Sequence, residues 1–438
     1  MFSETSSKEV AAAYELARRQ YARLGVDADA ALAALGQVPI SLHCWQGDDV
    51  KGLETRDEAV SGGGTLATGN YPGAARNGTE LRMDAERAMS LIPGELRFNV
   101  HACYAETGGE RVDRDQLKPE HFRTWMDWAK KHNLRLDFNG TFFAHPLANG
   151  GFTLSDADEE VRAFWVRHGI ASRMIAEAMG REQGGPCILN HWIPDGAKDS
   201  PIDRWAPRQR LMRSLDEMLG APVDRAFCLD CVEGKLFGIS SEDFVVGSHE
   251  FYMNYTASRR NARLCLDMGH FHPTETIHDK ISAVLSFQDG LLIHVSRGIR
   301  WDSDHVVVLN DDLRALFQEI VRGGALDRVN IALDYFDASM NRVGAWVIGT
   351  RCTQKAILAA LLEPSARLRE LEARGDMASK LAVLEELKTL PLGAVWDQYC
   401  HAAGAPVGPA WLNAMHDYEE AVQRPRAKAK CGGGCACG

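Results

Sequence analysis

Membrane spans, export signals and nucleotide-binding motifs are all missing from the sequence. No apolar run approaches the roughly 18 residues that a membrane-spanning helix needs. The segment from Met1 to Val10 carries charged side chains and no apolar core, unlike a secretory signal. No G-x-G-x-x-G motif follows a candidate strand, and G-x-x-x-x-G-K-[ST] is absent. We therefore expect neither a membrane protein nor a nucleotide-binding protein.

Basic residues are fewer than acidic residues in this sequence. The 438 residues include 49 Lys and Arg against 60 Asp and Glu, which gives a net charge of −11. A surface of this sign repels phosphate groups, so we expect no nucleic-acid partner. The excess of carboxylates is compatible with binding of divalent cations, although composition alone does not select that function.

The sequence contains cysteines, but their distribution does not indicate a set of disulfide bonds. The eleven cysteines are spread over a long chain without an export signal, which predicts reduced thiols and a cytoplasmic protein. Cys228 and Cys231 form a C-x-x-C inside the apolar run Ala226–Val232, and we interpret them as buried cysteines on a strand. Three more thiols lie in the Gly-rich C-terminus, where no histidine or fourth cysteine completes a metal site.

Strand-sized apolar runs alternate with amphipathic helical stretches along most of the chain. The runs are Pro39–Trp45, Leu96–Tyr104, Arg135–Phe143, Cys187–Pro194, Ala226–Gly234, Arg263–Gly269, Leu291–Arg297 and Val329–Phe336. Strand–helix alternation predicts parallel strands, and about eight such units predict an α/β fold, a (β/α)8 TIM barrel. A doubly wound open sheet is the alternative, but its Gly-rich nucleotide turn is missing. The glycines at 62–64 open no helix and are interpreted as a mobile loop.

Helical additions flank the predicted barrel, which we place at residues 36–363. Residues 1–35 are rich in Ala and charge and have a helical pattern. Residues 364–423 predict a C-terminal helical arm that cannot bury much against itself. We expect this arm to pack on a neighbouring subunit, so that the protein forms an oligomer. Residues 424–438 are rich in Gly, Lys and Cys without apolar anchors, which predicts a disordered tail.

Ligand-type side chains gather at the ends of the last four predicted strands. They are Glu233, Asp267, His294 and Asp334, followed within a few residues of two of these strands by His270, Asp302 and Asp304. The C-terminal ends of the strands form the face on which barrel enzymes keep their active sites. A single acid there would be interpreted as a cap. So many carboxylates on one face would repel one another unless a cation lay between them.

The set is large enough for two metal ions. Asp302 and Asp304 share one side of an extended segment, so both can reach one ion together with His270. The other four side chains, Glu233, Asp267, His294 and Asp334, can hold the second ion. Ligands that are mostly oxygen with some imidazole suit Mn²⁺, Mg²⁺ or Co²⁺ and allow Zn²⁺. They argue against Cu(I) and against an iron–sulfur cluster.

Two histidine patterns are weaker. His249 and Glu250 begin an H-E-x-x-H motif that fails because residue 253 is Met, so we interpret them as an exposed helix start. His270 and His272 resemble the H-x-H pair of metal-dependent hydrolases, but those enzymes keep the pair on the first strand, which here offers only His43.

Tryptophans follow three of the predicted strands. Trp45, Trp192 and Trp301 each fit simple packing, but together they predict an apolar wall beside the metals, as sugar-binding sites often have.

Long strings around these residues closely resemble the L-rhamnose isomerases, from about Ala11 to Gln423. The strings are Ser41–Asp49, Ala67–Gly73, Trp192–Gly196, Val232–Gly238, Leu266–Glu275, His294–Arg297, Arg300–Val306 and Leu333–Ser339. They are much more specific than a generic metal-binding pattern. The resemblance implies a metal-dependent (β/α)8 barrel, usually a homotetramer, that interconverts L-rhamnose and L-rhamnulose and has Mn²⁺ as its expected metal.

The resemblance also implies roles for individual residues. It places a structural metal on Glu233, Asp267, His294 and Asp334, and a catalytic metal on His270, Asp302 and Asp304. Lys235 matches the family's active-site lysine, and His101 and Trp192 match positions of the substrate pocket. Two features depart from the family: Gly234 stands where a small polar residue is expected, and the Cys-rich tail has no counterpart.

Other functions remain open on the sequence alone. The chain can act on another aldose, or it can be a barrel metallo-hydrolase. A nuclease would need a basic groove, which the net charge of −11 disfavours. A metal-storage or sugar-binding protein would have no use for so many open ligands or for Lys235.

Overall fold

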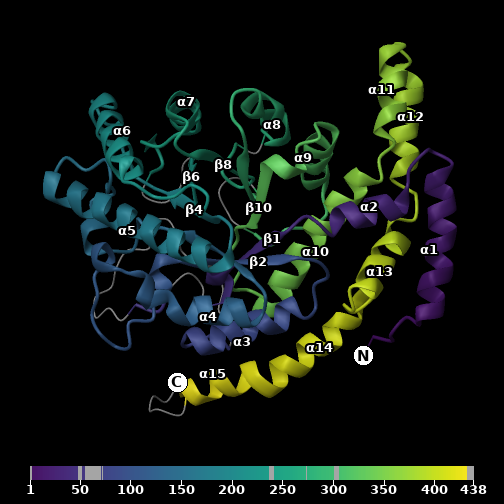
Figure 1. Cartoon of the computed structure of the whole chain (residues 1–438), viewed down its shortest axis with the longest axis horizontal. Helices are drawn as coiled ribbons and strands as arrows, with labels where there is room; N and C mark the ends of the chain where they lie inside the picture. The colour runs from purple at the N-terminus through teal and green to yellow at the C-terminus, as the bar shows by residue number, and fades with distance from the viewer. Residues whose placement is uncertain are drawn as a thin grey trace.

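The structure, a computed structural model, is a closed barrel of parallel strands surrounded by helices (Figure 1). It describes residues 2–47, 52–54, 71, 73–235, 241–272, 274–299 and 305–431. Around the barrel the strands follow the order β1-β10-β9-β8-β6-β4-β3-β2, and β1 pairs with both β2 and β10. The predicted (β/α)8 TIM barrel is therefore confirmed. Among the described residues, no helix is both long and apolar enough to traverse a bilayer.

Each predicted apolar run contains one barrel strand. The strands are β1 (Ile40–His43), β2 (Leu96–His101), β3 (Arg135–Asn139), β4 (Cys187–Trp192), β6 (Cys228–Glu233), β8 (Arg263–Asp267), β9 (Leu291–Val295) and β10 (Val329–Leu333). Most of their residues are buried on both faces, as expected for parallel strands covered by helices. The predicted runs extend past the strands at their C-terminal ends, because buried residues continue into the loops that form the site. Two short strands, β5 (Gly196–Ala197) and β7 (Phe244–Val245), pair outside the barrel and were not predicted.

One long helix follows each barrel strand. These helices are α3 (Gly78–Met89), α4 (Arg123–Lys131), α5 (Glu159–Gln183), α6 (Trp205–Gly220), α7 (His249–Arg259), α8 (His278–Leu285), α9 (Asp311–Arg322) and α10 (Arg342–Leu361). Several begin at a side chain that accepts a backbone N–H, such as Asn77 before α3 and Asn310 before α9. Their apolar faces cover the barrel: Phe98 of β2, for example, contacts the rings of Trp125 and Trp128 in α4.

A small apolar cluster lies inside the barrel below the ends of five of its strands. Ile188, Cys231, Cys265, Leu292 and Ala332 form a separate buried cluster from five neighbouring strands. Cys231, Cys265 and Leu292 each lie two residues before Glu233, Asp267 and His294, so they share the inward face with those residues. The predicted burial of Cys228 and Cys231 on a strand is confirmed.

Helices from both termini pack along one side of the barrel. They are α1 (Ser7–Ala22), α2 (Ala28–Leu35), α11 (Ser365–Ala373), α12 (Met377–Leu387), α13 (Leu392–Ala402) and α14 (Trp411–Tyr418). Figure 1 shows α11 and α12 projecting as a hairpin, while α13 and α14 run along the edge of the molecule. Trp396 and Cys400 of α13 are buried within this chain. Part of the arm therefore packs on α1 and α10 of this chain, and α12 is the helix of the arm with no buried residue.

The expected disordered tail is wrong for its first eight residues, because Arg424–Cys431 form the helix α15. Arg426 is buried, and its Nη1 donates to Asp84 Oδ2 of α3 at 2.8 Å. Tyr418 also donates to Asp84, at 2.6 Å. The anchor is thus a buried ion pair rather than an apolar contact. Residues 432–438, like the glycines at 62–64, lie outside the described residues.

Candidate metal centre and active site

Four ligand-type side chains come together at the C-terminal ends of adjacent strands. Glu233 and Asp267 are the last residues of β6 and β8, His294 lies in β9, and Asp334 follows β10. The strand register places Asp267 beside His294. All four side chains offer ligand atoms that lie within 4.8 Å of one another. The sequence prediction that these four residues form one group is therefore matched by their positions in the barrel.

The imidazole of His294 lies at the centre of three carboxylates. Its Nδ1 is 2.9 Å from Asp334 Oδ2, 3.3 Å from Glu233 Oε2 and 3.7 Å from Asp267 Oδ2. Both His294 nitrogens, Glu233 Oε1 and Asp267 Oδ2 are buried and have no hydrogen-bond partner among the described residues. Buried polar atoms are normally paired, so this set is left open for a ligand. Three carboxylates and one imidazole are a donor set that fits Mn²⁺, Mg²⁺ or Co²⁺.

Neighbouring groups orient each carboxylate. Asn190 Nδ2 donates to Glu233 Oε2, and the backbone N–H of Gly269 donates to Asp267 Oδ1 at 2.6 Å. The indole of Trp45 donates to Asp334 Oδ1 at 3.1 Å. In Asp267 and Asp334 one oxygen is therefore held while the other faces His294. Such outer partners fix the direction of ligand atoms in metal sites.

The electrostatics of the group also call for a cation. Burial, together with the negative charges of Asp334 and Glu233, raises the pKa of Asp267 to about 7 despite the opposing influence of His270. Burial alone would lower the pKa of His294, but neighbouring acidic groups such as Glu233 and Asp334 outweigh it and raise that pKa well above its usual value. The pKa values of both side chains are thus shifted in the direction that adds positive charge to the group, as a bound cation would.

His270 lies beside this group and belongs to the second predicted set. It is buried, and its Nδ1 is 3.1 Å from both Gly234 O and Glu233 Oε1. Donation from Nδ1 to the Gly234 carbonyl leaves Nε2 as the nitrogen that can bind a metal. Asp302 and Asp304 lie outside the described residues, as does Trp301, so their place near His270 stays a prediction.

Aromatic rings form a wall beside the ligands. Trp192, at the end of β4, stacks with His270 at 6.2 Å between ring centroids and meets Phe143 edge-on at 5.3 Å. Phe143 in turn contacts His101 at 5.4 Å, and His101 contacts Trp45 at 5.3 Å. The structure thus brings Trp45, Trp192 and His101 to one wall, and adds Phe143, which sequence reasoning missed.

Lys235 is buried next to this wall. Its Nζ lies 5.3 Å from the centre of the Trp192 ring, in the geometry of a cation–π contact. It follows Glu233 by two residues along the chain. Phe143 could have been found from the sequence, because it ends the third predicted apolar run on the same barrel face.

Two of the weaker histidine interpretations need correction or are not supported. His249 does begin α7, but it is buried rather than exposed, and it stacks on Phe271 at 3.9 Å. A Cβ on Gly234 would lie 2.9 Å from His249 Cδ2, which explains why glycine stands there. His272 is exposed and bonds Thr274, so it does not join His270 as a ligand pair.

Solved structures match this chain only at low sequence identity. One is a D-psicose 3-epimerase with D-tagatose from Clostridium cellulolyticum H10, with a TM-score of 0.46 and 11% identity over 74% of this chain and 96% of that chain. Another is a D-allulose 3-epimerase from Methylomonas sp., with a TM-score of 0.43 and 14% identity over 73% and 94% of the two chains.

Sequence relatives are much closer. An L-rhamnose isomerase of Rhodopirellula baltica is 57% identical over 415 residues, covering 95% of this chain and 96% of the relative. An L-rhamnose isomerase of Yersinia pseudotuberculosis is 55% identical over 414 residues, covering 94% and 98%. The sequence profile of the L-rhamnose isomerase (RhaA) family matches residues 8–426. The chain therefore belongs to the L-rhamnose isomerase family.

Proposed function

We propose that this enzyme is a metal-dependent aldose–ketose isomerase that interconverts L-rhamnose and L-rhamnulose by hydrogen transfer between C1 and C2. The observation that carries the proposal is the group of three carboxylates around His294, two of them buried and that of Asp334 half-buried, together with the aromatic wall that Lys235 contacts. Relatives more than half identical over nearly the whole chain are named for this activity. An isomerase of another aldose is the alternative, and a barrel metallo-hydrolase is disfavoured by the family.

The residues divide between two metal ions in this proposal. Glu233, Asp267, His294 and Asp334 would hold the structural ion. His270, Asp302 and Asp304 would hold the catalytic ion, an assignment of the two aspartates that rests on the family resemblance. We expect Mn²⁺, with Co²⁺, Mg²⁺ or Zn²⁺ as substitutes. When bound, the ions would polarise sugar oxygens and lower the pKa of bound water.

The chain's own groups then have separate tasks. Trp192 and His101 bind the sugar, and the aromatic wall excludes water on one side. Lys235, held against the Trp192 ring, stabilises negative charge that develops on a sugar oxygen. A hydride shift between C1 and C2 needs no protein base, whereas an enediol path needs one on carbon. For an enediol path we assign Asp334 as that base, because the indole of Trp45 orients its carboxylate.

The test is an assay with metal removal. Protein stripped with EDTA should form no ketose from L-rhamnose, and Mn²⁺ or Co²⁺ should restore turnover. Asp267→Asn should bind less metal at equal Mn²⁺ concentration, as measured by elemental analysis after gel filtration. Incorporation of solvent deuterium at C1 or C2 separates the enediol path from a hydride shift. No ketose with any of the four metals would overturn the proposal, and a higher kcat/KM on another aldose would favour the alternative.

We also propose that the functional unit is a homotetramer. The support is the projecting α11–α12 hairpin, on which Met377 and Leu381 are 52% and 59% exposed. Large apolar side chains on an isolated hairpin cost free energy in water, and a second copy of this chain would cover them.

A further inference from the structure

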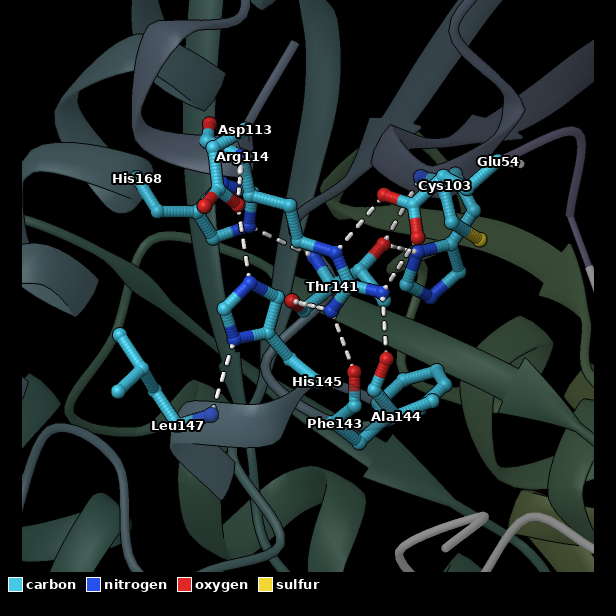
Figure 2. Close-up of polar contacts among 11 residues, drawn as sticks. Glu54, Cys103, Asp113, Arg114, Thr141, Phe143, Ala144, His145, Leu147 and His168 are labelled. Carbon is cyan, nitrogen blue, oxygen red and sulfur yellow. Dashed lines mark hydrogen bonds and ion pairs between the residues drawn. The ribbon is translucent and has the colours of Figure 1, made fainter. Parts of the chain in front are cut away.

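A series of buried polar contacts leads from His101 into the barrel wall behind the aromatic side of the site. Figure 2 shows the part of this series formed by Thr141, His168 and Arg114. His101 Nδ1 contacts the hydroxyl of Thr141, Thr141 contacts His168, and His168 contacts Arg114. His101 is 5% exposed and both Thr141 and His168 are 0% exposed. Each hydrogen in the series must therefore be accounted for within the protein.

The proton on His168 has one possible position. The backbone N–H of Thr141 donates to His168 Nε2 at 3.0 Å, so Nε2 is the acceptor. The other nitrogen, Nδ1, lies 3.0 Å from the carbonyl oxygen of Arg114, which can only accept. His168 thus carries its hydrogen on Nδ1. Burial lowers its pKa to about 3, so the ring is neutral. These two bonds fix the backbone of Thr141.

Arg114 holds the rest of this segment in place. Its guanidinium donates to the carbonyls of Thr141, at 2.8 Å, of Phe143, and of Ala144, at 3.0 Å. It also forms a two-point ion pair with Glu54, at 3.0 and 2.9 Å, as Figure 2 shows. Ala144 has a positive φ of 51°, which a residue with a Cβ rarely adopts without such restraint. The backbone that positions the Thr141 side chain is consequently held by several hydrogen bonds.

The hydroxyl of Thr141 decides the state of His101. The backbone N–H of Cys103 donates to Thr141 Oγ1 at 3.1 Å, so this contact uses an acceptor position of the hydroxyl. Among the described residues, His101 Nδ1 is then the one acceptor for the hydroxyl hydrogen. With the opposite assignment, Nδ1–H would donate to the hydroxyl and leave a buried O–H without an acceptor, which is strongly disfavoured.

We propose that Thr141 is a positioning residue that keeps His101 in the tautomer with hydrogen on Nε2, so that His101 meets the sugar as a hydrogen-bond donor. Nε2 forms no hydrogen bond to any described residue, so it is the nitrogen available to substrate. A neutral ring with Nε2–H has no lone pair on that atom, so His101 cannot remove a proton from the sugar there. It binds an oxygen that accepts, which can be a ring, hydroxyl or carbonyl oxygen.

The inference rests on the proposed function, because it takes the sugar as the ligand of His101. The direct test is nitrogen NMR of ¹⁵N-histidine-labelled holoenzyme loaded with diamagnetic Mg²⁺, with the His101 signals identified by their absence in His101→Gln. We expect Nδ1 to give the shift of an unprotonated ring nitrogen and Nε2 that of a protonated one. A protonated Nδ1 overturns the proposal, whether or not the enzyme accepts rhamnose.

Two pairs of variants test the role in turnover. Thr141→Val keeps the shape and removes the hydroxyl, so kcat/KM should fall about tenfold or more with bound metal unchanged, while Thr141→Ser should restore most of it. His101→Gln presents an amide N–H near the position of Nε2, and His101→Asn near that of Nδ1. We expect Gln to retain about tenfold more kcat/KM than Asn.

The two failures are distinguishable. If the wild-type enzyme turns over L-rhamnose but Thr141→Val does so equally well, or Asn at position 101 matches Gln, the positioning role is wrong. If the wild-type enzyme forms no ketose, the proposed function is wrong, and the NMR result still decides the tautomer.

Discussion

Trp45 donates from its indole Nε1 to Asp334 Oδ1 across 3.1 Å, so a residue that follows the first barrel strand holds one that follows the last. The strands β1 and β10 are neighbours in the closed barrel. The bond leaves Asp334 Oδ2 at 2.9 Å from His294 Nδ1. The ring of Trp45 also contacts His101. One side chain therefore joins the proposed metal ligands to the aromatic wall.

We expect Trp45→Phe to weaken metal binding, because it removes the N–H that orients Asp334. The variant keeps an aromatic ring at this position. Loss of such an outer partner lowers metal affinity by about tenfold or more. Titration of metal-free protein with Mn²⁺ measures the change. Trp396→Phe in α13 is the control, since Trp396 is also a buried indole but lies in the C-terminal arm. Equal Mn²⁺ affinity of Trp45→Phe and wild type would contradict the orienting role.

Lys235→Met should lower kcat and kcat/KM together while the metal content stays normal, because the ammonium acts on charge present only in the transition state. Metal content and kcat are measured on the same sample. The control is Lys355→Met, whose ammonium lies 5.3 Å from the centre of the Trp396 ring, a matching contact on the outer helices. If Lys235 only balances the carboxylates, the variant will instead lose metal, and metal-saturated protein will turn over normally.

Two truncations of the C-terminus should behave differently. Removal of residues 432–438 should leave activity and Tm unchanged. Removal of residues 424–438 should destabilise the protein by about 3–5 kcal/mol, because Asp84 would stay buried without Arg426. Urea unfolding checks both. Arg426→Met should reproduce the larger effect, and adding Asp84→Asn should recover part of it. A neutral Arg426→Met would show that the ion pair is not the anchor.

Acid should destabilise the fold through its buried neutral histidines. Burial lowers the pKa of His168 to about 3, whereas an unfolded histidine has a pKa near 6.5. Between these two pKa values, His168 therefore binds a proton in the unfolded chain but not in the native chain. The stability from this histidine is complete above pH 6.5 and is lost as the pH falls towards 3, by about 1.4 kcal/mol per pH unit.

In His168→Gln, the side chain at this position no longer binds a proton when the chain unfolds. The variant should be less stable than wild type at pH 7. The difference between their free energies of unfolding should become smaller as the pH is lowered from 6 to 4. Urea unfolding at each pH measures it, and His401→Gln, at an exposed position, is the control. A difference of constant size would mean that His168 does not take up a proton on unfolding.

Assembly should depend on α12. Leu381→Glu places a charge on its exposed apolar face, so the tetramer should dissociate in light scattering or sedimentation. Leu16→Glu is the control, because Leu16 is 54% exposed on α1 at the other end of the chain. If Leu381→Glu keeps the assembly intact, α12 is not part of the interface.

Most of the barrel strands and the central residues of the candidate metal site could be predicted from the sequence. Strands buried on both faces appear as continuous apolar runs, so Leu291–Val295 was found within its run, and residues such as Glu233 stand out because they end such runs. The C-terminal anchor was missed for a physical reason. Arg426 and Asp84 are charged and lie 342 positions apart, and no local pattern shows that they meet in a buried ion pair.

The positioning contacts behind His101 were also beyond local patterns. Thr141, His168 and Arg114 come from three separate segments, and each alone is an ordinary polar residue. Their role depends on which nitrogen or oxygen accepts, which only the folded geometry determines. The packing of α13 within this chain does not follow from the sequence of the arm alone, because the surfaces that it contacts lie in distant segments of the chain.

The apolar cluster below the ligands has a kinetic consequence. Ile188, Cys231, Cys265, Leu292 and Ala332 place groups that neither hydrate an ion nor carry it directly beneath the ligand group, on the side of the barrel formed by β4, β6, β8, β9 and β10. We therefore expect an ion held by this group to leave through the loops at the C-terminal face, the side on which we propose that the sugar binds. A sugar bound there would stand between the proposed structural ion and the solvent, and the release of that ion to a chelator should slow as the sugar concentration rises.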